Sequence, residues 1–263
     1  CPQRCPNKKR HKSFINVRVP YTWNMATRFS NLTLANEPMG RADCAPALPL
    51  LAREAFSFAY MRTSAAFAST VPLDVVGNGR HVMVIPGFMA SDQTTSRLRR
   101  SLQNAGFAAH GWGLGRNKGI KSDIFERLGR RVEELEIDGP LTLVGWSLGG
   151  LIAREYAKVA RHDVAKVVTL GSPFSGDPRA NNAWRVYEFV AGYKVDNPPL
   201  DVILSEKPPV PTCAFWSRND GVVAPGSACG QHHESDHQVE LDCTHMAFVA
   251  RPDAIRAIAK VLV

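Results

Sequence analysis

From residue 81 onward, short apolar runs alternate with amphipathic stretches, and this alternation limits the folds open to the chain more than any other feature. Strands covered on both faces are rich in Val, Ile and Leu. Six runs of that kind are predicted as strands: 81–86, 107–112, 141–146, 164–170, 212–217 and 238–241. Helical segments separate most of them. We therefore predict an α/β fold with a mostly parallel central sheet and helices on both faces.

Residues 174–210 break this alternation, because they show no clear strand or helix period and contain five prolines. They connect the predicted strand ending at Leu170 to the one beginning at Thr212. A connection of this length is uncommon unless it serves as a lid or a binding loop. We predict a lid or cap at 174–210 within a single domain of residues 25–263. The sequence leaves the mobility of this segment open.

The basic character of the chain is concentrated near its start. The net charge is +8, and residues 1–24 hold six Lys or Arg and no Asp or Glu. We interpret these residues as a solvated, poorly ordered tail, with Met25 as a candidate native start. A nucleic-acid-binding module would depend on this tail alone, so we expect no nucleic-acid partner.

The cysteines and the apolar segments bear on the compartment. The six cysteines show no CxxC or Cys/His metal spacing, so we expect no metal site. Cys229 and Cys243 bracket a short segment and could staple it, but buried thiols are expected where no secretion signal is recognisable. Residues 45–61 are apolar, yet Arg53 and Glu54 interrupt them and the stretch is too short for a membrane span. We expect a cytoplasmic protein without stable membrane insertion.

Gly145 to Gly149 form a Gly-x-Ser-x-Gly motif, the chain's strongest chemical signal. The apolar run 141–144 precedes the motif, and a helical segment beginning at Leu148 follows it. A nucleophile elbow requires this strand–turn–helix setting, in which a sharp turn holds a serine hydroxyl above the sheet. Ser147 is therefore a candidate nucleophile.

Three further motifs accompany the elbow: Ile85-Pro86-Gly87-Phe88, Ser217-Arg218-Asn219-Asp220-Gly221 and Thr244-His245-Met246. In this order, the four motifs resemble the α/β-hydrolase family, lipase and esterase branch, over residues 81–263. The resemblance implies the α/β-hydrolase fold, with the lid or cap inserted after its sixth strand. One departure is Pro86-Gly87, where many lipases have His-Gly, and it leaves open how that loop is braced.

The resemblance also implies a role for each matched residue. Ser147 would be the nucleophile, His245 its general base and Asp220 the carboxylate that orients the imidazole. The backbone N–H groups of Phe88 and Leu148 would form an oxyanion hole. This chemistry needs no cofactor.

Other residues remain rivals for two of these roles. An Asp-Gly after a strand is commonly only a turn, and a lone His is more often structural than catalytic. The rival acids are Asp177, Asp196, Asp201, Asp236 and Asp242, and the rival bases are His232, His233 and His237. The three histidines form a polar cluster typical of a loop, which could bind a metal adventitiously.

Several apolar residues near the motifs are candidates for substrate binding. They are Met89, Trp146, Phe174, Trp184, Tyr187 and Met246. Packing of the core and of the lid explains these residues equally well.

The sequence favours a serine hydrolase that cleaves a small-molecule acyl ester through an acyl-serine intermediate. Thioester or amide cleavage and acyl transfer remain open, because fold and triad do not select the leaving group. A non-enzymatic ligand receptor with this fold also remains open. Haloalkane dehalogenation is disfavoured, since it needs a carboxylate at position 147. The acyl chain length, the alcohol portion and the oligomeric state are not indicated.

Overall fold

The computed structural model describes residues 44–54, 57, 70–160, 162–195, 197, 199–200 and 202–263. A six-stranded sheet forms its centre, in the order β2-β1-β3-β4-β5-β6, and all neighbouring strands are parallel. The strands are β1 (His81–Ile85), β2 (Ala108–Gly111), β3 (Leu141–Trp146), β4 (Val164–Leu170), β5 (Thr212–Trp216) and β6 (His237–Glu240). The predicted parallel sheet is confirmed. The predicted basic tail, residues 1–24, lies outside the described residues.

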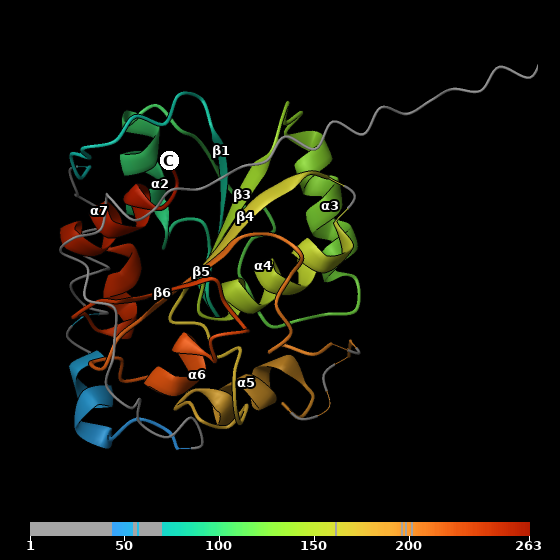
Figure 1. The fold of residues 1–263 in the computed structure, drawn as a ribbon. Helices are drawn as coiled ribbons and strands as arrows, with labels where there is room; N and C mark the ends of the chain where they lie inside the picture. Colours follow the sequence, from blue (N-terminus) through green and yellow to red (C-terminus); the bar gives the residue numbers. More distant parts are fainter. Residues whose placement is uncertain are drawn as a thin grey trace, which may run out of the picture. The chain divides into compact units, whose positions relative to one another are not determined.

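Helices cover both faces of this sheet (Figure 1). One face carries α3 (Ile124–Glu134) and α4 (Leu148–Val159), and the other carries α2 (Ser96–Asn104) and α7 (Pro252–Lys260). Beyond one end of the sheet lie α5 (Trp184–Ala191) and α6 (Pro225–Cys229). A short 3₁₀ helix, η1 (His245–Val249), precedes α7, and residues 48–54 form an N-terminal helix (blue in Figure 1).

The core lies between the sheet and these helices, which explains the composition of the strands. Every residue of β3 is buried, and so are the central residues of β1 and β4. Both faces of such strands meet apolar side chains, so their sequences are continuous apolar runs rather than alternating ones. Helix α4 is buried along ten of its twelve residues because it packs on β1, β3 and β4 beneath α3.

The order of the strands fixes where a site can form. From β1 the chain crosses to β2 on one side, and it then returns to β3 on the other side of β1. Ligands of open parallel sheets bind at the carboxyl ends of the strands near such a reversal. The loops that follow β1, β3, β5 and β6 meet at this edge.

Residues 174–210, which the sequence predicts to be a lid or cap and which are here called the cap, follow β4, the fourth strand of this chain rather than the sixth. It contains α5, a helix that the sequence pattern did not predict, and Gly192 ends this helix in the left-handed conformation (φ 82°). No α5 residue is fully buried, so the apolar periodicity that marks a core helix is weak here.

Two sets of hydrogen bonds attach the cap to the rest of the fold. Near its start, Asn181 pairs with Val223 in an isolated β-bridge, and the Asn182 N–H donates to the Val222 carbonyl (2.7 Å). Near its end, the guanidinium of buried Arg154, on α4, donates to the carbonyls of three consecutive residues: Leu204, Ser205 and Glu206.

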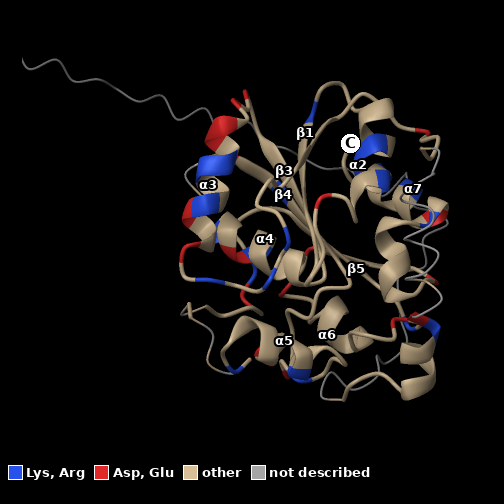
Figure 2. Ribbon diagram, turned by 180° about the vertical axis from the view of Figure 1, so that it is seen from behind, with Lys and Arg blue, Asp and Glu red and all other residues tan. Residues whose placement is uncertain are grey.

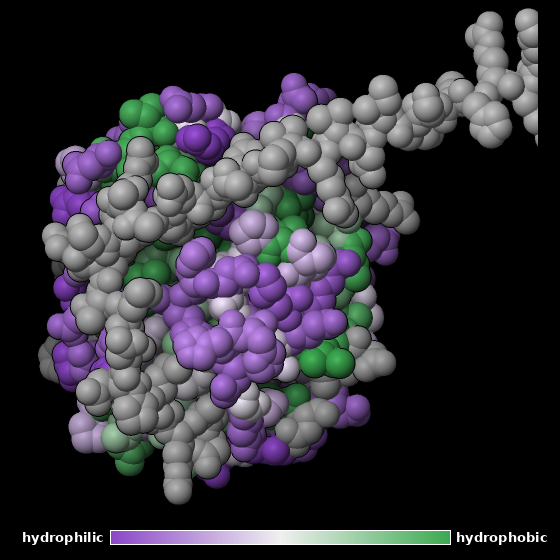
Figure 3. Space-filling view, viewed as in Figure 1, coloured by the Kyte–Doolittle hydropathy of each residue, from purple (hydrophilic) through white to green (hydrophobic). Residues whose placement is uncertain are grey.

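The surface carries charges of both signs. On α3, Glu126 pairs with Arg130 and Arg131 pairs with Glu134, and Figure 2 shows both colours on this helix. Hydrophilic residues also dominate the centre of the face seen in Figure 3. Mixed charges of this kind are typical of a solvent-facing helix.

The cysteines and helices can be compared with the sequence expectations. Cys213, Cys229 and Cys243 are buried free thiols, so the structure forms no staple between the last two. Burial raises the pKa of Cys229 to about 12. Within the described ranges, no helix combines the length and the hydropathy that crossing a bilayer requires.

Candidate active site

Ser147 lies at the sharp turn between β3 and α4. Its backbone has φ 54° and ψ −121°, a conformation that costs energy for any residue except glycine. The turn is held because the Ser147 N–H donates to the Leu170 carbonyl (2.8 Å) and its carbonyl accepts from the Gly150 N–H (2.9 Å). This is the geometry of a nucleophile elbow at the amino end of a helix.

The two glycines of the motif are required by space. A Cβ on Gly145 would lie 2.3 Å from the Gly149 carbonyl oxygen, and a Cβ on Gly149 would lie 2.3 Å from that of Ile85. These neighbours are backbone atoms, which cannot turn aside as a side chain can. The elbow therefore packs directly against β1.

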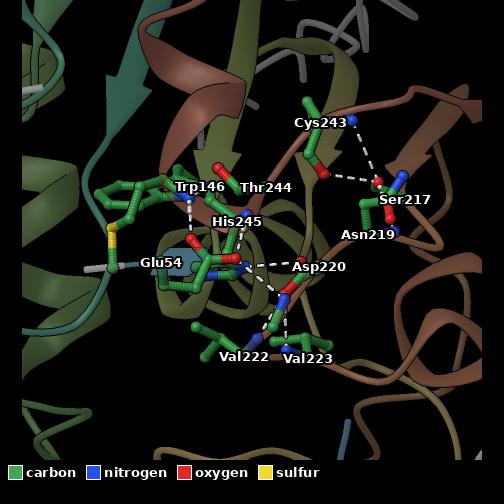
Figure 4. A network of polar contacts seen from close by, with 12 residues as sticks. Glu54, Trp146, Ser217, Asn219, Asp220, Val222, Val223, Cys243, Thr244 and His245 are labelled. Atoms are coloured by element: carbon green, nitrogen blue, oxygen red, sulfur yellow. Dashed lines mark hydrogen bonds and ion pairs between the residues drawn. The ribbon is translucent and has the colours of Figure 1, made fainter. Parts of the chain in front are cut away.

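Asp220 and His245 form a buried pair after β5 and β6 (Figure 4). His245 Nδ1 lies 2.7 Å from Asp220 Oδ2, and the other carboxylate oxygen accepts from the backbone N–H groups of Val222 and Val223, both at 2.8 Å. An ionised carboxylate can only accept, so the proton of the neutral imidazole sits on Nδ1 and Nε2 is left as the acceptor.

Neighbouring aromatic residues fix the plane of this histidine. The Trp146 indole donates to the His245 carbonyl (3.1 Å), and the two rings lie 5.7 Å apart. Phe248 meets the imidazole edge-on. Trp146 thus lies behind His245, within the core.

Charge determines the basicity of His245. Burial alone lowers the pKa of its imidazole, but the charge and hydrogen bond of Asp220, together with the charge of Glu54, outweigh burial and hold the pKa above the ordinary value. The imidazolium form is therefore stabilised in this site.

Glu54 is part of this network, although no sequence motif marks it. Its Oε1 accepts from the N–H groups of Gly221 (2.9 Å) and His245 (2.7 Å), and its Oε2 accepts from that of Met246 (3.1 Å). The residue is 4% exposed. The only signal in the sequence was an acidic residue inside an apolar stretch, which the pattern left as an interruption of that stretch.

The loop after β1, residues 86–90, runs against Ser147. A Cβ on Gly87 would lie 3.2 Å from that of Ser147. Among the described residues, the N–H groups of Phe88 and Leu148 donate to no backbone acceptor outside the helices and strands. Two N–H groups of this kind are the components of an oxyanion hole.

Buried Asn117 braces this loop, which answers the question raised by Pro86-Gly87. Its side-chain amide donates to the Pro86 carbonyl (2.8 Å). Its backbone accepts from the Met89 N–H (2.7 Å) and donates to the Ala90 carbonyl (2.8 Å). Three hydrogen bonds thus hold a loop in which Met89 has a positive φ of 59°.

Ser147 opens on an apolar cavity beneath the cap. Of the candidate substrate-binding residues, Trp184 and Tyr187 line this cavity together with Phe88 and Leu148. Lining residues that the sequence reasoning missed are Ile120, Leu151, Pro173, Pro178, Asn181, Ala183, Tyr193, Val195, Val202, Leu204, Val222 and Val223. Most of them come from the cap or from loops, where no strand or helix period marks a buried side.

The other four candidates lie away from the cavity lining. Met89 is 38% exposed, and Met246 is half-buried beside Glu54. Trp146 lies behind His245, and Phe174 is buried beneath the Arg154 guanidinium, which lies 4.1 Å from its ring centroid.

The cap contacts the loop after β1 through Tyr187. Its ring lies 5.1 Å from that of Phe88, and its hydroxyl accepts from the Ile120 N–H (3.2 Å) and bonds to the Tyr193 hydroxyl. Burial raises the pKa of Tyr187. The phenols therefore close one side of the cavity as neutral groups.

The rival acids that the structure describes have other partners. Asp177 accepts from the Arg179 N–H, Asp236 from Thr212 and Lys207, and Asp242 from Asn219. Asp196 and Asp201 lie outside the described residues. His232, His233 and His237 are exposed. In the part of the chain that the structure describes, no three His, Cys, Asp or Glu side chains gather as ligands of a metal ion would.

Known proteins share this architecture. The family model described as "alpha/beta hydrolase fold" matches residues 113–197. A lipase-esterase related protein from Clostridium acetobutylicum matches with a TM-score of 0.51 and 15% identity, over 74% of this chain and 100% of that one. The monoacylglycerol lipase of Paleococcus ferrophilus matches with 0.51 and 15%, over 72% and 95%. A 2,6-dihydroxy-pseudo-oxynicotine hydrolase matches with 0.50 and 16%, over 73% and 62%. No curated protein matches significantly in sequence. At these identities the structural likeness extends to the fold.

Proposed function

Since this chain is an α/β hydrolase by its fold, we propose that it cleaves carboxylic ester bonds with Ser147, His245 and Asp220. The main support is the buried Asp220–His245 pair, which lies at the same sheet edge as the strained turn of Ser147. A strained serine that lines an apolar cavity, with a paired histidine at the same sheet edge, supports acyl-transfer chemistry.

The reaction follows from the protonation state of the pair. His245 Nε2 takes the proton of the Ser147 hydroxyl as its oxygen attacks the ester carbonyl carbon, and Asp220 stabilises the imidazolium that forms. His245 then gives this proton to the leaving alcohol, and an acyl-serine remains. Water then loses a proton to His245 as its oxygen attacks the acyl carbon, and His245 passes that proton to the Ser147 oxygen as the acyl–serine bond breaks and the acid leaves. A positioned base of this kind contributes about 10²- to 10⁴-fold in rate.

The N–H groups of Phe88 and Leu148 would hold the oxygen that becomes negative in each addition step. Loss of one such donor typically raises the barrier by about 3–4 kcal/mol. Because Asn117 braces the Phe88 loop, this half of the oxyanion hole is formed before substrate binds.

The cavity favours an uncharged, apolar acyl group. Its lining is aliphatic or aromatic apart from Ser147, Asn181 and the phenols of Tyr187 and Tyr193. An apolar pocket with few polar groups binds by burying apolar surface. A thioester carrying the same acyl group would fit the same site.

The test is hydrolysis of p-nitrophenyl esters from acetate to palmitate by the protein and its Ser147→Ala variant. Loss of the nucleophile should lower kcat by about 10⁶-fold. Ser122→Ala, a change at an exposed loop serine, serves as the matched control and should keep full activity. Activity that survives Ser147→Ala would exclude Ser147 as the nucleophile.

Labelling with a fluorophosphonate probe separates an enzyme from a receptor with the same fold. An activated Ser147 reacts with the probe even if every ester tried is a poor substrate. Absence of both labelling and hydrolysis would contradict the proposal and favour the receptor.

A further inference from the structure

We propose that Glu54 is a positioning residue of this site, whose carboxylate joins the loop of Asp220 to the loop of His245. The inference depends on the proposed function of Ser147, His245 and Asp220. We call residues 217–224 the Asp220 loop and residues 241–246 the His245 loop.

The hydrogen bonds of Glu54 go to both loops. One oxygen accepts from Gly221, the residue after Asp220, and also from the backbone of His245 itself. The second oxygen accepts from Met246, the residue after His245. Figure 4 shows this carboxylate lying against His245, on the Trp146 side. One side chain therefore fixes the backbone of both members of the acid–base pair.

Residues around Glu54, in the helix 48–54 and at Ser57, contact the same two loops. A Cβ on Gly221 would lie 2.3 Å from the Leu50 carbonyl oxygen, so the helix backbone packs directly on the Asp220 loop. Arg53 donates to the Asn219 side chain (3.3 Å), and the hydroxyls of Ser57 and Thr244 lie 2.6 Å apart. The position of Glu54 is thus set by contacts on both sides of it.

A carboxylate suits the position of Glu54 because it only accepts hydrogen bonds. Three N–H donors converge on Glu54, and a carboxylate is acceptor-only, with room for all three. A glutamine would offer one carbonyl oxygen and turn an NH₂ group toward the Met246 N–H. That half-buried N–H would then lose its acceptor, and the His245 loop would lose one of its supports.

The charge of Glu54 also acts on the imidazole of His245. Two charged groups act on His245, Asp220 and Glu54, whereas its neighbours Trp146 and Phe248 carry no charge. The thiol of nearby Cys243 stays neutral because burial raises its pKa. The negative charge of Glu54 favours the imidazolium, which is the form that His245 takes when it removes a proton from Ser147. Removal of this charge lowers the pKa of His245.

Two variants separate position from charge. Glu54→Gln removes the charge and one acceptor, whereas Glu54→Asp keeps the charge on a shorter side chain. The matched control is Asp92→Asn, because the Asp92 carboxylate also accepts from two backbone N–H groups, those of Trp112 and Gly113 at 3.0 Å. Asp92 is not among the groups that shift His245.

The readouts are kcat and KM for a p-nitrophenyl ester, the pH profile of kcat/KM, and an NMR titration of the His245 imidazole in the full chain. For Glu54→Gln we expect kcat to fall at least about tenfold with little change in KM. We also expect the His245 titration to move to lower pH. For Glu54→Asp we expect a loss of kcat with the titration near that of the unchanged protein. Asp92→Asn should change neither.

An unchanged kcat and an unchanged His245 titration in Glu54→Gln would overturn the inference, even where Ser147→Ala has abolished activity. An equal loss in Asp92→Asn would also overturn it, since the effect would then be general destabilisation. Retained activity in Ser147→Ala would reject the proposed function instead. The NMR titration still tests the action of Glu54 on His245 in that case, because it needs no turnover. If Glu54→Gln does not fold, Glu54→Asp carries the test.

Discussion

Ser147 lies where the backbones of β1, β3 and α4 pack very closely. At Gly145 and Gly149 they leave no room for a Cβ atom. The missing Cβ at Gly145 is what lets α4 leave β3 so abruptly and leaves the serine in its strained conformation. Such strain persists only where the surrounding structure imposes it. The elbow should therefore be among the least tolerant positions of the chain.

Gly145→Ala tests this intolerance. The new methyl group would meet the Gly149 carbonyl at 2.3 Å, so we expect the free energy of unfolding to fall by about 3 kcal/mol. Urea denaturation followed by circular dichroism measures this change. The control is Gly129→Ala within α3, where the added Cβ would lie 3.8 Å from the Tyr156 hydroxyl. That variant should gain up to about 1 kcal/mol from helix propensity. Equal stabilities of the two variants would contradict the packing argument.

The pH dependence of the reaction follows from the state of His245. Only the neutral imidazole can accept the Ser147 proton, so kcat/KM should rise with pH and level off above the pKa of this histidine. Asp220 and Glu54 hold that pKa above the ordinary 6.5, so we expect the half-maximal point above pH 6.5. A pH profile with p-nitrophenyl acetate measures it, and a half-maximal point below pH 6.5 would contradict the expectation.

The sequence predicts those candidate site residues that belong to a local motif. Ser147, Asp220 and His245 each follow a strand within a short pattern of small or turn-forming residues. Glu54 and Asn117 could not be found this way, because each acts by bonding to backbone groups that are remote in sequence. Glu54 and Gly221, for example, are 167 positions apart. Such contacts leave no periodic trace.

Helix α5 contributes two aromatic side chains to the lining of the cavity. Trp184 and Tyr187 line the cavity one turn apart, whereas Phe189 on the same helix is 87% exposed. The helix thus carries apolar residues on both its inner and its outer side. This explains why periodicity did not reveal it.

Trp184→Ala should alter the acyl preference of the proposed esterase activity. Removal of the indole enlarges the cavity, so we expect the optimal p-nitrophenyl ester to shift to a longer or bulkier acyl chain. Phe189→Ala is the matched control, because it truncates an aromatic side chain of the same helix that faces solvent. Comparison of kcat/KM over the acetate-to-palmitate series measures both variants. If the profile of Trp184→Ala equals that of Phe189→Ala, Trp184 is not a determinant of chain length.

The loop after β1 is supported by a residue that the loop's own motif does not identify. The motif predicts a role for this loop but not its support, since Pro86-Gly87 stands where many lipases have His-Gly. The structure supplies the support from Asn117, which lies after β2, the strand on the far side of β1. Neighbours in the sheet, rather than neighbours in sequence, thus determine how the loop is held.

Across the whole molecule, the sheet was the most predictable feature. All six strands lie where apolar runs predicted them, and the differences are confined to strand ends, such as 108–111 for the predicted 107–112. Burial on both faces makes these runs conspicuous. The strand order is less visible in the sequence, because it depends on which helices cover which face.

The attachment of the N-terminal helix to the Asp220 and His245 loops has a consequence for when the site can form during synthesis. On a ribosome, residues 48–54 are made early, but their partners at 219–221 and 244–246 appear some 170 to 190 residues later. Until then the Glu54 carboxylate has none of its three donors. A chain released before its last strand would hold Ser147 in a nearly complete sheet and still lack a working base. If Ser147, His245 and Asp220 act as proposed, the nascent chain should therefore gain its esterase activity only after residues 48–54 have met the loops at 219–221 and 244–246.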